Sequence, residues 1–201
     1  MFKLIFAALI AFFVLWFANK QYIPEQFRDS VAGNVVNSAL LPVEYKIARL
    51  AGKELKPVSS MVNIDAARMY ALISSLVKVN KDTVVFLYDS NSYFSRYVLK
   101  GINDLAKQYQ KPQKAVFLVM AFDDDKEKLT YMLKDLGKLH FRPIYTSASN
   151  IKDATAELKK NNITVSGVPA VVFKDSSTGI YENITPDFGS RKVLFNRINK
   201  N

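Results

Sequence analysis

The sequence predicts an α/β fold in which helices pack against a central sheet of mixed strand direction, preceded by a separate membrane-anchor helix. Short apolar runs rich in β-branched and aromatic residues, such as Thr83–Tyr88 and Ala115–Phe122, alternate with stretches of helical periodicity. Two more strand-like segments follow each other across a turn near the C-terminus, so parallel and antiparallel strands should share one sheet. The chain has 201 residues, of which 49% are apolar and 23% charged, enough for one ordered domain plus accessory segments.

The first expected element is an apolar segment at the N-terminus. Leu4–Ala18 reads LIFAALIAFFVLWFA and lies between Lys3 and Lys20. As a helix it would measure about 22 Å, shorter than a hydrocarbon core of about 30 Å, although neighbouring aromatic residues can extend it into the membrane interfaces. We therefore predict that residues 2–18 contact a membrane.

Removal of this segment would require a signal peptidase site, with small residues at the last and third-last positions before the cut. A cut after Ala18 would place Trp16 at the third-last position, and Trp is too large. We predict a single-pass signal anchor over residues 1–20, with the folded domain outside the cytoplasm, on the periplasmic or lumenal side. A cleaved signal peptide and a buried helix of a soluble protein remain alternatives.

A juxtamembrane helical segment is predicted over residues 21–58. Ile47 and Leu50 belong to an apolar stripe that is compatible with a helix, and a break containing proline follows near residue 58. The segment is either a spacer or a helix that binds a partner or a second copy of the chain. The folded domain is expected to occupy residues 59–201.

Within this domain, helices are expected where apolar residues recur at spacings of three and four, and strands where apolar runs stand between turn signals. Ser92 can cap one helix, and Gly137 can end another. In chain order, the expected elements are a helix Ile64–Val79, a strand Thr83–Tyr88, a helix Ser92–Tyr109, a strand Ala115–Phe122, a helix Lys126–Leu136, a strand Phe141–Tyr145, a helix Ile151–Lys160, the hairpin strands Val168–Lys174 and Gly179–Asn183, and a helix Ser190–Asn199.

The chain is basic, with 28 Lys and Arg, 18 Asp and Glu and a net charge of +10. The excess is spread along the chain and forms no dense basic block. A generic solvated surface is one interpretation and a preference for a membrane surface is another. No motif of a nucleic-acid-binding module is present, so we expect no nucleic-acid partner.

Two segments resemble parts of the thioredoxin-like family. Val84–Arg96 reads VVFLYDSNSYFSR and resembles its first central strand and active-site turn, whereas Gly167–Phe173 reads GVPAVVF and resembles its cis-proline strand. The resemblance spans residues 83–199, and its extended middle is similar to periplasmic thioredoxins of the cytochrome-maturation type. It implies a thioredoxin-like three-layer sandwich with a mixed central sheet and a cis bond between Val168 and Pro169.

The redox motif of that family departs from its pattern in this chain. By the resemblance, Ser92 and Ser95 stand where the two redox cysteines would be, and the chain contains no cysteine at all. A thiolate must attack and a sulfur must leave in thiol–disulfide exchange, and a hydroxyl supplies neither. The chain is therefore not expected to be a thiol–disulfide oxidoreductase. We predict no catalytic residue and no cofactor.

The remaining chemical groups favour structural roles. His140 is the single histidine, and the predicted order of elements places it away from Ser92, so a Ser–His pair is not expected. Asp123–Asp125 is the one carboxylate cluster, but it lacks the spacing and the glycine of a calcium loop. We interpret this cluster as an acidic turn that starts a helix, and we predict no metal site.

We predict a redox-inactive, membrane-anchored thioredoxin-like domain that acts as a protein-binding, assembly or chaperone-like module. In that family the cis-proline strand offers backbone groups to an extended partner chain, so a protein or peptide partner is expected on this face. The predicted binding residues are Asn91, Ser92, Tyr93, Phe94, Ser95, Val168 and Pro169. One alternative is a glutathione- or thiol-binding transferase-like enzyme that uses Ser92. Another is an assembly role carried by the anchor and residues 21–58.

Overall fold

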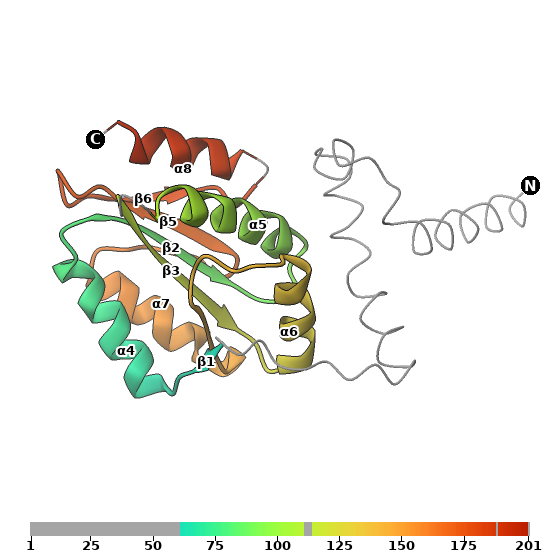
Figure 1. The fold of residues 1–201 in the computed structure, drawn as a ribbon. Helices are drawn as coiled ribbons and strands as arrows, with labels where there is room; N and C mark the ends of the chain where they lie inside the picture. Colours follow the sequence, from blue (N-terminus) through green and yellow to red (C-terminus); the bar gives the residue numbers. More distant parts are fainter. Residues whose placement is uncertain (1–60, 111–113, 188, 201) are drawn as a thin grey trace, which may run out of the picture. The chain divides into compact units, whose positions relative to one another are not determined.

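The computed structural model describes residues 61–110, 114–187 and 189–200, which form a six-stranded sheet with helices on both faces (Figure 1). The strands are β1 Val62–Asn63, β2 Asp82–Tyr88, β3 Ala115–Phe122, β4 Pro143–Thr146, β5 Ala170–Lys174 and β6 Tyr181–Ile184. The helices are α4 Ala66–Ser75, α5 Tyr93–Gln108, α6 Lys126–Asp135, α7 Ile151–Lys160 and α8 Ser190–Ile198, with short 3-10 turns at Leu76–Lys78 and Ala148–Asn150.

The strands run in the order β1-β4-β3-β2-β5-β6 across the sheet. The pairs β1–β4, β4–β3 and β3–β2 are parallel, whereas β5 is antiparallel to both β2 and β6. The register pairs Leu87 with Ala170 and Thr83 with Lys174. The C-terminal end of β2 and the start of β5 therefore meet at one end of the sheet, and the β5–β6 turn lies at the other end.

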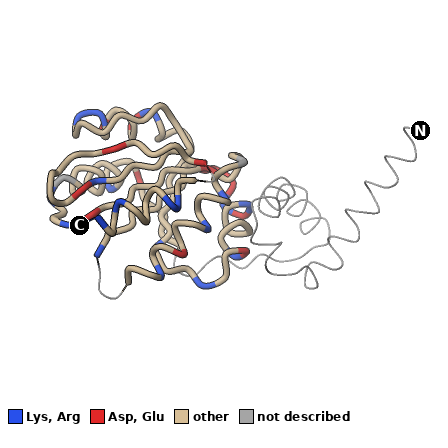
Figure 2. The backbone as a smooth tube through the Cα atoms, turned by 90° about the horizontal axis from the view of Figure 1, so that it is seen from above, with Lys and Arg blue, Asp and Glu red and all other residues tan. Residues whose placement is uncertain are grey.

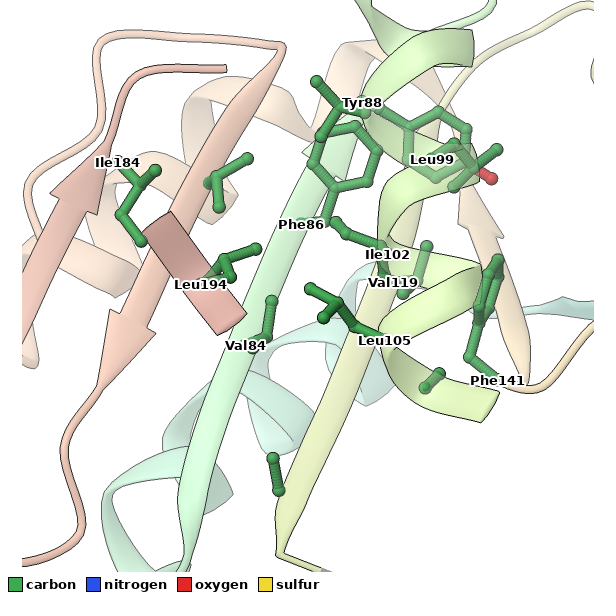
Figure 3. Packing of buried hydrophobic residues seen from close by; sticks show 14 of the residues in the cluster. Val84, Phe86, Tyr88, Leu99, Ile102, Leu105, Val119, Phe141, Ile184 and Leu194 are labelled. Carbon is green, nitrogen blue, oxygen red and sulfur yellow. The ribbon is translucent and has the colours of Figure 1, made fainter. Parts of the chain in front are cut away.

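Helices cover the two faces of the sheet and give three layers. On one face, Val84, Phe86 and Tyr88 of β2 pack with buried residues of α5, α6 and α8 (Figure 3). On the other face, Val85 and Leu87 of the same strand pack with α4 and α7. Every residue of β2 is buried, because a central strand covered on both faces has no solvent side, and this accounts for its continuous apolar sequence.

The elements predicted for the folded domain are all present, with some differences at their ends. The β5–β6 hairpin begins at Ala170 rather than at Val168, since Pro169 has no N–H group to donate to the ladder. The helix expected from Ile64 begins at Ala66, because the Asp65 side chain accepts the Arg68 N–H and caps it. The two-residue strand β1 was not predicted.

The predicted anchor over residues 1–20 and the juxtamembrane segment over residues 21–58 lie outside the described residues. Among the residues that are described, no helix combines the length and the apolar character needed to cross a membrane.

Candidate functional site

Two carboxylates hold the turn between β2 and α5. Asp89 Oδ1 accepts the backbone N–H groups of Asn91, at 2.8 Å, and of Ser92, at 2.6 Å. Asp123 follows the neighbouring strand β3, and its Oδ2 accepts the Ser90 N–H at 2.7 Å. Asp123 Oδ1 also accepts the Asp125 N–H at 2.8 Å. Charge-assisted hydrogen bonds of this kind fix the backbone of the turn before the helix starts.

Ser92 occupies the N-cap position of α5, but its side chain makes no capping hydrogen bond. The prediction that the Ser92 hydroxyl caps this helix is therefore wrong. The Asp89 carboxylate accepts the Ser92 N–H instead, so the side chain that holds the turn in place is that of Asp89, three residues before Ser92. The Ser92 side chain is half-buried, whereas Asn91 is exposed and its Oδ1 accepts a hydrogen bond from Lys128 Nζ at 2.5 Å.

Three buried hydroxyl groups lie in and around this turn without a hydrogen-bond partner among the described residues, those of Tyr88, Ser90 and Ser95. Ser95 is completely buried in the first turn of α5, so its side chain does not reach the surface of the predicted binding face. Burial, and secondly the negative charge of Asp123, raise the pKa of the Tyr88 hydroxyl far above its ordinary value. All three groups are neutral hydroxyls, and none is an activated nucleophile.

The Val168–Pro169 peptide bond is cis, as the resemblance implied. Gly167 before it has a φ of +154°, a backbone conformation that residues with a side chain rarely adopt. Val168 and Pro169 are half-buried, and Ala170 directly after them pairs with Leu87 near the end of β2. The structure thus brings both segments of the resemblance to the same end of the sheet.

A pocket of about 350 Å³ lies beside the cis-proline segment. Its lining comes from the loop that precedes the cis bond, from the start of β5, and from the end of β6 with the residues after it. None of the described residues that line it is charged: Thr164, Val165, Ser166, Pro169, Ala170, Val171, Asn183, Ile184, Thr185 and Pro186. Of these, the sequence predicted only Pro169. No periodic or motif signal marks the others, which meet only in the folded chain.

The remaining predicted binding residues lie around the start of α5. Phe94 is half-buried and packs against the core cluster beneath this helix. Tyr93 is the first residue of α5. Among the predicted residues whose side chains the structure describes, Asn91, Ser92, Phe94, Val168 and Pro169 have some exposed surface, and Ser95 is buried beneath them.

The acidic cluster is engaged in local structure. Asp125 caps α6 by accepting the Lys128 N–H at 2.9 Å, and this confirms the helix-starting role predicted for the cluster. Asp124 Oδ1 accepts the Ser147 hydroxyl at 2.7 Å. Within residues 61–110, 114–187 and 189–200, no group of three or more His, Asp and Glu side chains could hold a metal ion.

His140 lies at the opposite end of the sheet from Ser92. It lines a second pocket together with Ala115 and Val116 at the start of β3, whereas Ser92 follows the end of the parallel strand β2. The His140 N–H donates to Asn103 Oδ1 at 2.8 Å. The structure therefore keeps Ser92 and His140 apart, as the order of elements predicted.

Comparisons with known proteins give matches among solved structures, while no family model and no curated protein matches the chain. One similar structure is a thiol:disulfide interchange protein of the thioredoxin family from Chlorobium tepidum, with 16% identity, coverage of 63% of this chain and 82% of that chain, and a TM-score of 0.48. Another is a thioredoxin-related protein from Neisseria meningitidis serogroup B, with 18% identity, coverage of 59% and 83%, and a TM-score of 0.46.

A third is a secreted disulfide oxidoreductase from Mycobacterium tuberculosis, with 15% identity, coverage of 61% and 83%, and a TM-score of 0.44. At these identities no activity is transferred to this chain. The strand order, the terminal hairpin and the cis bond before Pro169 agree with the thioredoxin-like fold that the two sequence segments implied. The chain has this fold without any cysteine.

Proposed function

We propose that this chain is a membrane-anchored, redox-inactive thioredoxin-like protein that binds an extended segment of a protein partner beside the cis-proline segment. The observation that carries the proposal is the uncharged pocket of about 350 Å³ next to Pro169. In a chain with a net charge of +10, an uncharged concave surface favours an apolar or neutral polar segment over a charged one.

The geometry of the β2–α5 turn and of the cis-proline segment supports binding of a partner rather than catalysis. The carboxylates of Asp89 and Asp123 hold the turn, and the pairing of Ala170 with Leu87 holds the start of β5 beside it. These contacts keep a preformed surface, and a preformed surface lowers the entropic cost of binding. Since the chain has no cysteine, none of this geometry can serve thiol–disulfide exchange.

The edge of the sheet beside the pocket suits an extended partner. Strand β6 is the last strand in the order of the sheet, and Asn183 and Ile184 at its end line the pocket. A partner segment lying there can use backbone hydrogen bonds for affinity while a side chain enters the pocket for specificity.

Photo-crosslinking in the native membrane tests this proposal. A photoreactive amino acid at Ser166, an exposed residue of the pocket, should crosslink one defined partner, and Val165→Asp, a half-buried valine of the pocket lining, should lower the yield about 10-fold in the same chain. The matched control is Val116→Asp, another half-buried valine at the opposite end of the sheet, which should leave the yield unchanged. An equal yield from both variants, with equal thermal unfolding, would contradict the proposal.

A second candidate function is a thiol-binding, transferase-like activity that uses Ser92. The observation in its favour is that the Ser92 hydroxyl makes no capping hydrogen bond at the start of α5, where helix N-H groups favour a bound thiolate. Titration calorimetry with glutathione tests it directly. A saturating heat signal that Ser92→Ala abolishes would support this function, and the absence of heat would exclude glutathione as its ligand.

A further inference from the structure

The outer side of α8 combines positive charge with exposed apolar side chains. Ser190, Leu194 and Ile198 are buried at a spacing of four, so this stripe faces the core, and Lys192 and Asn196 stand on the opposite side of the helix. We call Lys192, Val193 and Asn196, together with Lys200 and Ile180 in the β5–β6 turn, the α8 face. In Figure 1, α8 lies on the far side of α5 from α4 and α7.

All charged residues of this helix and of the residues after it are basic. Arg191, Lys192, Arg197 and Lys200 are basic, and residues 190–200 contain no Asp or Glu. The helix α7, on the other face of the sheet, mixes Lys152, Lys159 and Lys160 with Asp153 and Glu157. Figure 2 looks onto the molecule from the side of α8 and shows basic segments close to the C-terminus.

Acidic side chains beside α8 are already engaged with it. Glu182 accepts a hydrogen bond from Arg197 at 2.6 Å, and Asp104 lies 3.8 Å from Arg191. Lys192 and Lys200 are exposed, and Lys192 stands on the side of the helix opposite the buried stripe. The face therefore presents a net positive charge to whatever approaches it.

The described residues have three exposed large hydrophobic side chains, and two of them, Ile180 and Val193, lie on this face. Val193, on α8, is 39% exposed. Phe195 is 38% exposed but stands on the other flank of α8, where its ring centroid lies 6.4 Å from that of Tyr109. Ile180 is 65% exposed and stands just before β6. The Arg197–Glu182 pair joins the C-terminal end of α8 to the start of β6, so Ile180 lies at the same end of the domain.

We propose that the α8 face docks on an anionic lipid surface. Lys192 and Lys200 would lie among the headgroups, and the side chains of Ile180 and Val193 would enter the boundary with the acyl chains. The positive charge of the face favours an anionic partner. The exposed apolar side chains favour a partner with an apolar region in which they can be buried. A nucleic acid satisfies the first requirement alone.

Site-specific labels test this docking, because a chain without cysteine gives one label for each cysteine introduced. The full chain is placed in nanodiscs of phosphatidylcholine, with or without phosphatidylglycerol, and carries an environment-sensitive fluorophore at Asn196→Cys on α8. The matched control is Ala156→Cys, an exposed position of α7. In anionic discs the label on α8 should shift to the blue and lose access to a soluble quencher, and added salt should reverse both changes.

Charge reversal provides the second arm. Each basic residue removed from an anionic surface weakens contact about 5-fold, so Lys192→Glu with Lys200→Glu should lower the docked fraction by about 25-fold or more. Lys152→Glu with Lys159→Glu on α7 should leave it unchanged. Equal signals in neutral and anionic discs, or equal effects of the two double variants, would overturn the proposal. The same blue shift produced by heparin in neutral discs would also overturn it, in favour of a partner recognised by charge alone.

Discussion

At the scale of single residues, the buried hydroxyls around the β2–α5 turn are the most informative groups. A buried polar group without a partner carries a desolvation cost of roughly 1–3 kcal/mol. The hydroxyls of Tyr88, Ser90 and Ser95 are all in this state within the described residues. The turn therefore keeps polar groups at positions where apolar side chains would stabilise the fold more.

This cost predicts that Ser95→Ala stabilises the domain. Removing a completely buried, unpartnered hydroxyl from the first turn of a helix should raise the free energy of unfolding by about 1 kcal/mol, measured by urea denaturation. The control is Ser92→Ala, since that half-buried hydroxyl makes no capping bond and its loss should change stability by less than about 0.5 kcal/mol. A destabilised Ser95→Ala variant would show that the hydroxyl has a partner after all.

The turn also shows where residue-level prediction from the sequence fails. Ser92 stands at the start of a helix, as expected, and a serine there is a favoured N-cap. The sequence does not show that the Asp89 carboxylate, three residues earlier, takes the backbone N–H of Ser92. Competition between neighbouring side chains for the same backbone groups depends on geometry that spacing alone leaves open.

At the scale of elements, α8 closes one face of the sheet through a narrow buried stripe. Leu194 is completely buried in the cluster that includes β2 and α5, while its neighbour Val193 is exposed. Adjacent positions on one helix therefore differ sharply in the apolar surface that folding removes from water.

This contrast predicts unequal effects of two neighbouring truncations. Leu194→Ala should lower the free energy of unfolding by about 2–5 kcal/mol, because it removes buried methyl groups and leaves a cavity. Val193→Ala should lower it by less than about 1 kcal/mol, since Val193 is exposed. Thermal unfolding of both variants checks the difference. Similar losses would mean that α8 packs with another side toward the core.

A second element-level contact joins α4 to α7. Ser74 Oγ donates to Glu157 Oε1 at 2.9 Å, and Lys160 Nζ donates to Glu157 Oε2 at 3.0 Å. The hydrogen bond from Lys160, and next that from Ser74, hold the pKa of Glu157 below its ordinary value. A depressed pKa favours the folded state above the unfolded-state pKa, and this contribution is lost as the pH falls through the folded-state pKa.

Titration by NMR checks this assignment. The Glu157 pKa should lie below that of a free glutamate, and either Lys160→Gln or Ser74→Ala should raise it, with the larger rise from Lys160→Gln. Lys152→Gln, on the same helix but outside these contacts, serves as the control. A pKa that neither substitution moves would show that Glu157 makes these hydrogen bonds rarely in solution.

The elements themselves follow from periodicity to a large extent. The strand Ala115–Phe122 and the helix Ile151–Lys160 have the predicted ends, because an apolar run and a helical stripe each mark them clearly. Strand β1 was missed because two residues carry no pattern of alternation.

The pocket lining was missed for another reason. Its loops come from both sides of β5, and their proximity depends on the strand order rather than on local sequence.

At the scale of the whole molecule, the described residues place two different surfaces on one domain. The uncharged pocket lies beside the cis bond at Pro169, and the basic α8 face includes the turn before β6 at the opposite end of β5. Binding of a partner and contact with lipid would therefore use different side chains and could occur together.

The predicted domain boundary near residue 58 gives a prediction at this scale. Residues 59–201, expressed without the preceding segments, should unfold in one cooperative transition, because the described residues of this range form two buried clusters, one on each face of the same sheet. Denaturation followed by circular dichroism and by tyrosine fluorescence checks this expectation. Transitions that differ between the two probes, or the absence of a transition, would show that the first 58 residues are part of the folded unit.

The strand order has a consequence for how the chain is made. β2 is a fully buried strand, yet one of its two neighbours, β5, lies some 90 residues later, with Thr83 paired to Lys174. During synthesis from the N-terminus, the backbone groups along one edge of β2 stay unpaired until β5, Ala170–Lys174, has been made. Pairings this distant slow folding, and an open strand edge can pair with other chains. The nascent protein should therefore depend on chaperones until its C-terminal β5–β6 hairpin has been synthesised and can pair with β2.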